Sequence, residues 1–327
     1  MMSNLSPILA LAPMAGITDW PMRLLCTEQG CNYTTTEMVS AMGYLTAPDS
    51  LYVYQYLLAV SPDEPRPAVQ LFGHQPTMMG QAAQKLSDLG RFSAIDINMG
   101  CPARKVTGSG SGSALLCNLP LCAEIISAVR RSTSLPVTVK MRLGWDSEHI
   151  CAAELAHIAE DCGASMITVH GRTREQQYSG QADWQAIAQV KQAVHIPVLL
   201  NGDITSAESA LEALRETGCD GLAVGRGALG NPFLFAQIRA ALTGKPVEYP
   251  SFEQVIETAI RHGEMMRSWK PEHAAVTEMR KHMCWYIHGR RGAARLRTQL
   301  TALENLDEVY ALLRDFAQEQ NTLPVDT

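Results

Sequence analysis

The eight residues from Asn98 to Lys105 combine an amide, a thiol and two cations. They follow an apolar segment, 94–98, that predicts a buried strand, and they precede a glycine-rich loop that extends to Leu116. Because glycine lets a ligand approach the backbone closely, this arrangement is typical of a binding site. A thiol with its usual pKa of about 8.5 is protonated at neutral pH, so Cys101 could act as a general acid. The alternative is that Cys101 is a small buried apolar residue, as free cysteines often are.

Polar side chains also follow most other apolar segments of the chain. A lone Lys at a strand end is usually solvated and a lone His is usually structural, but Lys140 and His170 both end such segments. Two cations that converge with Gln70, Asn98 and Arg172 would suit the electron-rich N1–O2 edge of a reduced flavin. The residues expected at strand ends are Met14, Glu37, Gln70, Asn98, Lys140, Arg142, His170, Arg172, Asn201, Asp203, Gly225 and Arg226.

Two loops predict a phosphate site. Residues 225–230 match G-x-G-x-x-G between a predicted strand and a helix, but the acidic residue that a dinucleotide motif needs on a following strand is missing. In an eight-stranded barrel, phosphate sites recur in the loops after strands seven and eight, here 201–203 and 225–230. Backbone N–H groups and the Arg226 guanidinium would suit one phosphate monoester. The alternative is a glycine-rich helix entry without a ligand.

The C-terminal part of the chain is basic, whereas the rest is acidic. From Arg261 to Arg297 the net charge is +6, against −12 for the rest of the chain. Such a distribution favours a local contact with a polyanion, and aromatic residues within 285–288 could assist contact with RNA. A solvated charged face with aromatic residues that pack the helices is the alternative. The cations proposed for RNA are Arg280, Lys281, Arg290, Arg291, Arg295 and Arg297.

Eight strand-like segments must position these residues. After the second of them, each is followed by a helical stretch, and all are nearly continuous apolar runs, which indicates a parallel sheet covered on both faces. Eight such units over about 240 residues predict an α/β fold, a (β/α)8 TIM barrel. A doubly wound sheet is the alternative, but it would spread the polar strand ends along an edge. The predicted strands are 8–15, 33–39, 67–72, 94–98, 137–142, 166–170, 197–201 and 221–225.

A C-terminal all-helical domain is predicted beyond the barrel. Residues 1–244 form the catalytic barrel in this interpretation, and residues 245–327 form the helical domain, with helices near 252–268, 272–288, 292–302 and 306–319. The pattern of 42–62 fits either strand or helix. In the barrel, helices are expected at 76–89, 119–132, 148–162, 184–194 and 206–217.

Composition narrows the class of protein. Hydrophobic residues make up 46% and charged residues 18% of the 327, typical of a globular protein with a large core. No membrane span or signal peptide is predicted. The nine cysteines are scattered, without a Cys-x-x-Cys pair or zinc spacing, which favours a reducing cytoplasmic location with neither disulfide nor metal. We expect a monomer.

The sequence closely resembles the bacterial branch of the tRNA-dihydrouridine synthases, which reduce uridines of tRNA. The matching segments span nearly the whole chain and include LAPMAGITDWPMR, DINMGCPARKV, VTVKMRLGW, ITVHGRT, VGRGALGNP and MRKHMCWYIHGRRGAARLR. The loop TGSGSGSALL is richer in Gly and Ser than the form typical of close relatives. The resemblance implies an oxidoreductase acting on CH–CH bonds, with FMN as cofactor, NADPH as reductant and tRNA as partner.

The resemblance also implies roles for individual residues. Cys101 would donate a proton to C5 of uracil while C6 receives a hydride from the flavin. Asn98 would bind the uracil, Arg172 would lie beside the pocket, and Arg104 and Lys105 would contact RNA. FMN would lie against Pro13, Met14, Gln70, Lys140, His170, Asn201, Asp203, Gly225 and Arg226.

Two other functions remain open at this point. One is a flavin barrel that acts on a free pyrimidine or another small molecule, which requires neither RNA nor the C-terminal helices. The other is a non-enzymatic RNA-binding paralogue that retains the barrel but lacks the yellow flavin.

Overall fold

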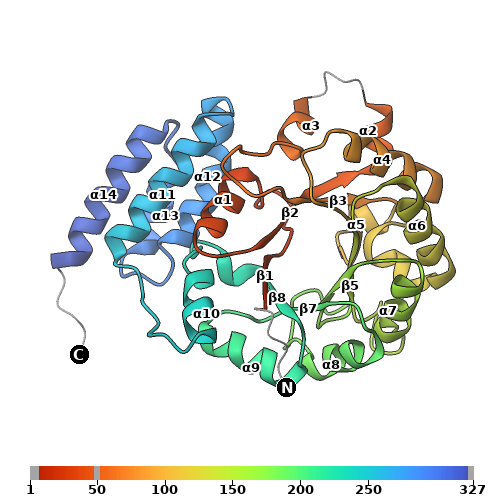
Figure 1. Ribbon diagram of the computed structural model, residues 1–327. Helices are drawn as coiled ribbons and strands as arrows, with labels where there is room; N and C mark the ends of the chain where they lie inside the picture. Colours follow the sequence, from red (N-terminus) through yellow and green to blue (C-terminus); the bar gives the residue numbers. More distant parts are fainter. Residues whose placement is uncertain (1–6, 48–51, 323–327) are drawn as a thin grey trace.

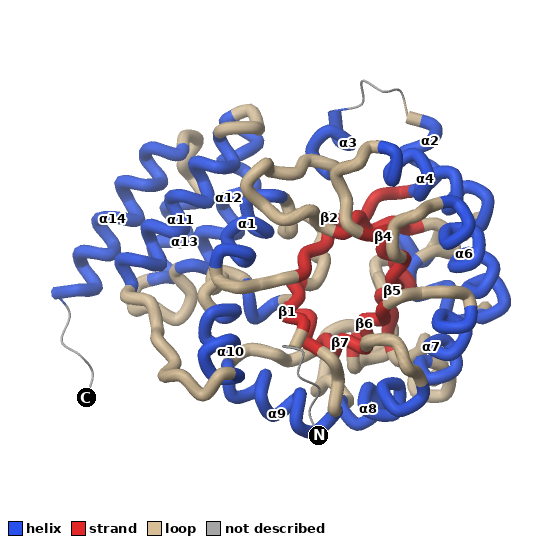
Figure 2. Tube along the Cα trace, in the orientation of Figure 1, coloured by secondary structure: helices blue, strands red, loops and turns tan. Residues whose placement is uncertain are grey.

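A computed structural model describes residues 7–47 and 52–322, and its central feature is a closed barrel of eight parallel strands in sequential order. The strands form a ring in Figure 2, with helices around it. This confirms the (β/α)8 prediction against the doubly wound alternative. The strands are β1 (Ile8–Leu11), β2 (Tyr33–Ser40), β3 (Ala68–Phe72), β4 (Ala94–Met99), β5 (Val137–Arg142), β6 (Met166–His170), β7 (Val198–Asn201) and β8 (Gly221–Val224).

The register of the central strands aligns polar residues in a row. Gln70 of β3 pairs with Asp96 of β4, and Asp96 pairs with Thr138 of β5. All three side chains are buried. Since residues two apart on a strand share a face, Asn98 lies on the same face of β4 as Asp96, one step nearer the C-terminal end. This row connects the barrel interior to the strand ends.

Helices cover the outside of the barrel (Figure 1), and their apolar faces pack against the strands. Residues 42–62, ambiguous in sequence, contain parts of two short helices on either side of 48–51, which lie outside the described residues. The barrel helices are α1 (Trp20–Glu28), α2 (Ala41–Thr46), α3 (Tyr52–Leu57), α4 (Pro76–Asp88), α5 (Arg104–Thr107), η1 (Gly112–Cys117), α6 (Leu119–Ser132), α7 (Ala152–Asp161), α8 (Trp184–Ala193), α9 (Ala207–Thr217), η2 (Arg226–Ala228) and α10 (Leu234–Leu242).

The largest differences from the predicted element lengths are in β1 and α7. Strand β1 ends at Leu11 rather than near residue 15, because Pro13 has no N–H to extend the ladder. Helix α7 begins at Ala152 rather than near 148. The Asp146 side chain accepts hydrogen bonds from the amides of Glu148 (3.0 Å) and His149 (2.9 Å), which holds the preceding residues in a turn.

The C-terminal helices have a core of their own. Buried side chains between Phe252 and Ala317 form a cluster separate from the barrel core. The helices lie beside α1 and α10 at one side of the barrel (Figure 1). Within the described ranges, no helix is long and apolar enough to cross a membrane. These helices are α11 (Phe252–Arg267), α12 (Glu272–Tyr286), α13 (Ala293–Leu300) and α14 (Leu306–Thr322).

Contacts fix these helices against the barrel. The Lys281 ammonium donates a hydrogen bond to the carbonyl of Gly16, in the loop after β1. Lys270 lies 3.4 Å from the Asp19 carboxylate and is almost fully buried. A Cβ at Gly230 would lie 2.4 Å from the carbonyl carbon of Trp285, so only glycine allows this approach. The loops after β1 and β8 are therefore held by residues of α12.

Candidate functional site

A cavity of about 1160 Å³ lies at the C-terminal ends of the strands. The polar strand ends converge there, as expected for a barrel mouth, and the volume is ample for a cofactor with part of a substrate. The predicted site residues that line this cavity are Pro13, Met14, Gln70, Asn98, Cys101, Arg104, Lys140, His170, Asn201, Asp203, Gly225 and Arg226.

Cys101 lies in the cavity wall, partly exposed. Two backbone contacts fix its position. The side-chain oxygen of Asn98 accepts hydrogen bonds from the amides of Gly100 (3.1 Å) and Cys101 (2.9 Å). Ser113 donates its amide N–H (3.1 Å) and its hydroxyl (2.9 Å) to the carbonyl of Cys101. Cys101 therefore lies in the cavity wall on a turn that is held on both sides, and it does not belong to the apolar core.

Lys140 and His170 both line the cavity, but they differ in charge. Burial and then the positive charge of Arg142 lower the pKa of Lys140 to about 8, so Lys140 is largely protonated at neutral pH. Burial, followed by the charges of Lys140 and neighbouring arginines, lowers the pKa of His170 to about 2. The expectation of two cations is therefore wrong: His170 is neutral because it is buried and because several positive charges surround it.

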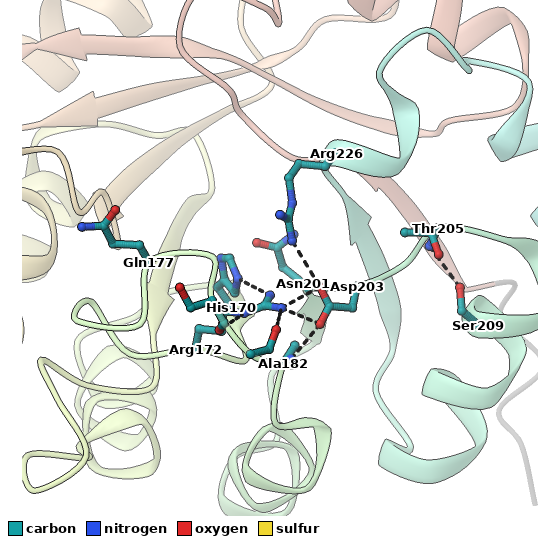
Figure 3. A network of polar contacts seen from close by, with 12 residues as sticks. His170, Arg172, Gln177, Ala182, Asn201, Asp203, Thr205, Ser209 and Arg226 are labelled. Carbon is teal, nitrogen blue, oxygen red and sulfur yellow. Dashed lines mark hydrogen bonds and ion pairs between the residues drawn. The ribbon is translucent and has the colours of Figure 1, made fainter. Parts of the chain in front are cut away.

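The two loops predicted to bind phosphate meet at the Asp203 carboxylate (Figure 3). Arg172 donates to both of its oxygens, at 2.9 and 2.7 Å, and Arg226 donates at 3.2 Å. The amide of Ala182 donates as well, at 2.7 Å. Burial raises the pKa of Asp203, but the Ala182 amide and the two guanidiniums outweigh this effect and keep the pKa below its usual value. Asp203 therefore holds the loops together.

Some predicted site residues lie outside the cavity lining. Arg172 is 2% exposed and donates hydrogen bonds to the cavity residue Asp203, consistent with a place beside the pocket. Lys105 is exposed on α5, next to the cavity residue Arg104. The carboxylate of Glu37, a predicted strand end, accepts a hydrogen bond from the amide of Gly16. None of these three residues lines the cavity itself.

The six cations proposed for RNA divide into packed and exposed groups. Arg280 donates to the carbonyl of Leu303 at 2.9 Å, and Lys281 is bound to the loop after β1. The guanidinium of Arg290 lies 4.5 Å from the ring centre of Phe252. The side chains of Arg291, Arg295 and Arg297 lie at the surface, with Arg295 at 3.3 Å from Glu319. Arg290 belongs to both groups, because its guanidinium packs on Phe252 while the residue is still exposed to solvent.

Among the cavity residues that sequence reasoning did not propose as site residues are Arg142, Tyr178 and His288. Tyr178 is 54% exposed, with the guanidiniums of Arg142 and Arg226 at 5.6 and 5.0 Å from its ring centre. Only its place in the loop after a strand could have indicated Tyr178. His288 follows α12, and its sequence neighbours placed it with RNA contacts but gave no sign that it reaches the barrel.

Comparison with known proteins identifies one family and relatives that are similar along nearly the whole chain. The sequence matches the dihydrouridine synthase family over residues 10–321. A probable tRNA-dihydrouridine synthase of Rhodobacter capsulatus is 43% identical over 320 residues, which cover 97% of both chains. The tRNA-dihydrouridine synthase B of Xanthomonas axonopodis pv. citri is 40% identical, over 96% of this chain and 93% of the relative.

A third relative gives the same result. The tRNA-dihydrouridine synthase B of Pseudomonas aeruginosa is 41% identical over 315 residues, which cover 96% of this chain and 94% of the relative. The family match includes both the barrel and the C-terminal helices. The chain belongs to the dihydrouridine synthase family.

Proposed function

We propose that this chain reduces uridines of tRNA to 5,6-dihydrouridine, with NADPH-reduced FMN as hydride source and Cys101 as general acid. The observation that carries the proposal is a partly exposed thiol in the wall of the same cavity as the Lys140 ammonium and two loops suited to a phosphate. Membership of the dihydrouridine synthase family and the tRNA specificity in the relatives' names support the choice of substrate.

The cavity residues fit FMN. A Cβ at Gly225 would meet no protein atom closer than 3.9 Å, and the nearest atoms belong to cavity residues Ala12, Met14 and Asn201. Glycine at this position therefore leaves free space where a ligand can approach the backbone. Arg226, 52% exposed at its side chain, and the backbone of the 225–227 loop would hold the phosphate. The Asp203 carboxylate does not repel that phosphate strongly, because two guanidiniums already neutralise it.

Lys140 and His170 would contact the flavin ring with different chemistry. The Lys140 ammonium donates to the side-chain oxygen of Asn201 at 3.0 Å and has further N–H groups for a ligand. Its positive charge would stabilise negative charge on the ring. His170 offers a neutral imidazole for hydrogen bonding. Bound FMN, once reduced by NADPH, supplies the hydride that uracil C6 accepts.

Cys101 completes the reaction at the other carbon. Its Sγ holds the proton that is delivered to C5 of uracil, and Asn98 lies beside it to bind the base. The target uridine must leave its stack to enter the barrel mouth. Exposed cations of the C-terminal region, including Arg291 between α12 and α13 and Arg297 on α13, would bind phosphates of the tRNA. The C-terminal helices thus contribute to substrate binding in this proposal.

The replacement Cys101→Ala tests the proposal. The variant should keep bound FMN and should still oxidise NADPH, because neither process needs the thiol. Reduction of tRNA uridine should fall by about 10²–10⁴-fold, the usual contribution of a general acid. Dihydrouridine is measured by mass spectrometry of tRNA digests, and FMN by absorbance. Equal turnover by the variant would contradict the role of Cys101. A colourless wild-type protein would instead support the RNA-binding alternative, and turnover of free uridine without RNA would support the small-molecule one.

A further inference from the structure

The carboxylate of Asp96 lies inside the barrel, below the cavity, and does not line it. It is 5% exposed and accepts two hydrogen bonds. The side-chain amide of Gln70 donates to one oxygen at 2.7 Å, and the hydroxyl of Thr138 donates to the other at 2.5 Å. The proposed reaction assigns no role to this carboxylate.

A chain of amide groups connects Asp96 to the catalytic turn. The side-chain oxygen of Gln70 accepts from the side-chain amide of Asn98 at 2.8 Å. The side-chain oxygen of Asn98 in turn accepts from the backbone amides of Gly100 (3.1 Å) and Cys101 (2.9 Å). Gln70, Asp96 and Asn98 are all buried, so water offers few alternative partners.

The carboxylate fixes the orientation of every amide in this chain. An ionised carboxylate only accepts hydrogen bonds, so Gln70 must turn its NH₂ group toward Asp96. Its oxygen then faces Asn98, which must present its own NH₂ group to Gln70. Only this orientation of Asn98 leaves an oxygen for the two backbone N–H groups. The opposite orientation would set donors against donors in a buried site, which is costly.

The same amide orientations are compatible with either ionisation state of Asp96. Burial raises the pKa of Asp96 above its usual value, although hydrogen bonds from Gln70 and Thr138 and the charge of Lys140 oppose this effect. In a protonated Asp96, the hydroxyl can donate to the Thr138 oxygen, since a hydroxyl both donates and accepts. With the proton on that side, the oxygen that faces Gln70 remains an acceptor, as in the ionised carboxylate.

We propose that Asp96 is a positioning residue: through Gln70 and Asn98 it fixes the backbone of Cys101 and holds the thiol in place for proton delivery. The consequence for catalysis rests on the proposed function, but the effect on the Cys101 backbone does not. Asp96 acts only through the amide chain and touches no substrate.

Three variants separate this role from general stability. Asp96→Leu removes both acceptors. Asp96→Asn should preserve the orientation, because its oxygen can face Gln70 while its NH₂ donates to the hydroxyl of Thr138. Thr138→Val is the matched control: it removes the other hydrogen bond to the same carboxylate, at similar depth, without interrupting the path to Cys101.

Two readouts are used, and the first needs no substrate. In Asp96→Leu, amide hydrogen exchange at Gly100 and Cys101, resolved by NMR, should accelerate by about fivefold or more, the effect of about one net hydrogen bond. Amides of β6, across the barrel, serve as the reference for global opening. Asp96→Asn and Thr138→Val should exchange at these positions like wild type. The second readout is tRNA-uridine reduction, where kcat should fall in Asp96→Leu, measured on protein with the same FMN content as wild type.

The outcomes distinguish the two proposals. Unchanged exchange at Gly100 and Cys101 in folded Asp96→Leu would overturn the positioning role, as would equal acceleration in Asp96→Asn and Asp96→Leu. If Asp96→Leu does not fold, Gln70→Met interrupts the path one step later and should show the same local acceleration; unchanged exchange there overturns the role. Accelerated exchange together with a wild-type protein that reduces no uridine would support the positioning of Cys101 and contradict the proposed reaction.

Discussion

His170 and Lys140 lie in one cavity wall but carry different charges at neutral pH. His170 ends β6 as predicted, whereas Lys140 lies within β5, two residues before its end. Sequence reasoning treated both as cations because the charge of a histidine depends on neighbours from other strands. Those neighbours, Lys140, Arg142, Arg172 and Arg226, all come from the same barrel mouth. The cluster of positive charge suits an anionic ligand, and the neutral imidazole limits its repulsion in the free protein.

This charge state predicts how stability depends on pH. The pKa of His170 is about 6.5 in the unfolded chain and about 2 in the folded protein, so between these values the unfolded chain binds one more proton. Stability from His170 is therefore complete above pH 6.5 and is lost as pH falls below it, by up to about 1.4 kcal/mol per pH unit. In FMN-free His170→Gln, the free energy of unfolding in urea should show a correspondingly smaller decrease between pH 6.5 and 5. Identical pH slopes in both proteins would contradict a neutral buried His170.

At the scale of elements, the loop between α5 and η1 is packed against the turn of Cys101. A Cβ at Gly112 would lie 2.8 Å from the carbonyl oxygen of Cys101 and 3.3 Å from its Cβ. Gly112 also has φ +61°, and nearby Gly110 has φ +80°. A Cβ at Gly110 would instead meet the ring of His74, at 3.6 Å, and no atom of Cys101. The two glycines share a left-handed backbone but differ in what they touch.

These two glycines provide a matched test of whether the loop positions the Cys101 thiol. Gly110→Ala should lower stability by about 1 kcal/mol, because alanine is strained at positive φ. Gly112→Ala should lower stability by more, because its Cβ would also lie 2.8 Å from the carbonyl oxygen of Cys101 and from Cγ1 of Val106. Only Gly112→Ala should displace Cys101, and a displacement of this kind lowers kcat for uridine reduction by about 10- to 100-fold. Rates on tRNA at saturating NADPH provide the comparison. Equal rates in the two variants would show that the loop does not set the position of Cys101.

Much of the fold was predictable because the strands are short, largely apolar runs, most of which carry a polar residue near or just beyond the C-terminal end. The eight strands, most helices and the convergence of Gln70, Asn98, Cys101 and Lys140 follow from that pattern alone. Contacts between distant segments were not predictable in the same way. The partners of Asp96 depend on strand register, and the contact of Lys281 with Gly16 depends on how the C-terminal helices dock.

At the scale of the whole molecule, the barrel and the C-terminal helices meet at the mouth of the cavity. Lys281 binds the loop after β1, Trp285 packs on Gly230 in the loop after β8, and His288 lines the cavity itself. A tRNA bound to the exposed cations of these helices would therefore lie close to the opening. The same helices fix two of the loops that surround the proposed FMN site, so in this proposal the substrate and the cofactor would bind at one shared rim.

The most direct test of the central claim is mass-spectrometric mapping of dihydrouridine in tRNA from cells that lack this gene. The cells are complemented with the wild-type chain or with Cys101→Ala, both confirmed to be expressed and to contain FMN. The account predicts that dihydrouridine is lost at one or more tRNA positions, is restored by the wild-type chain and is not restored by Cys101→Ala. Unchanged dihydrouridine at every position without the gene, or full restoration by Cys101→Ala, would contradict it.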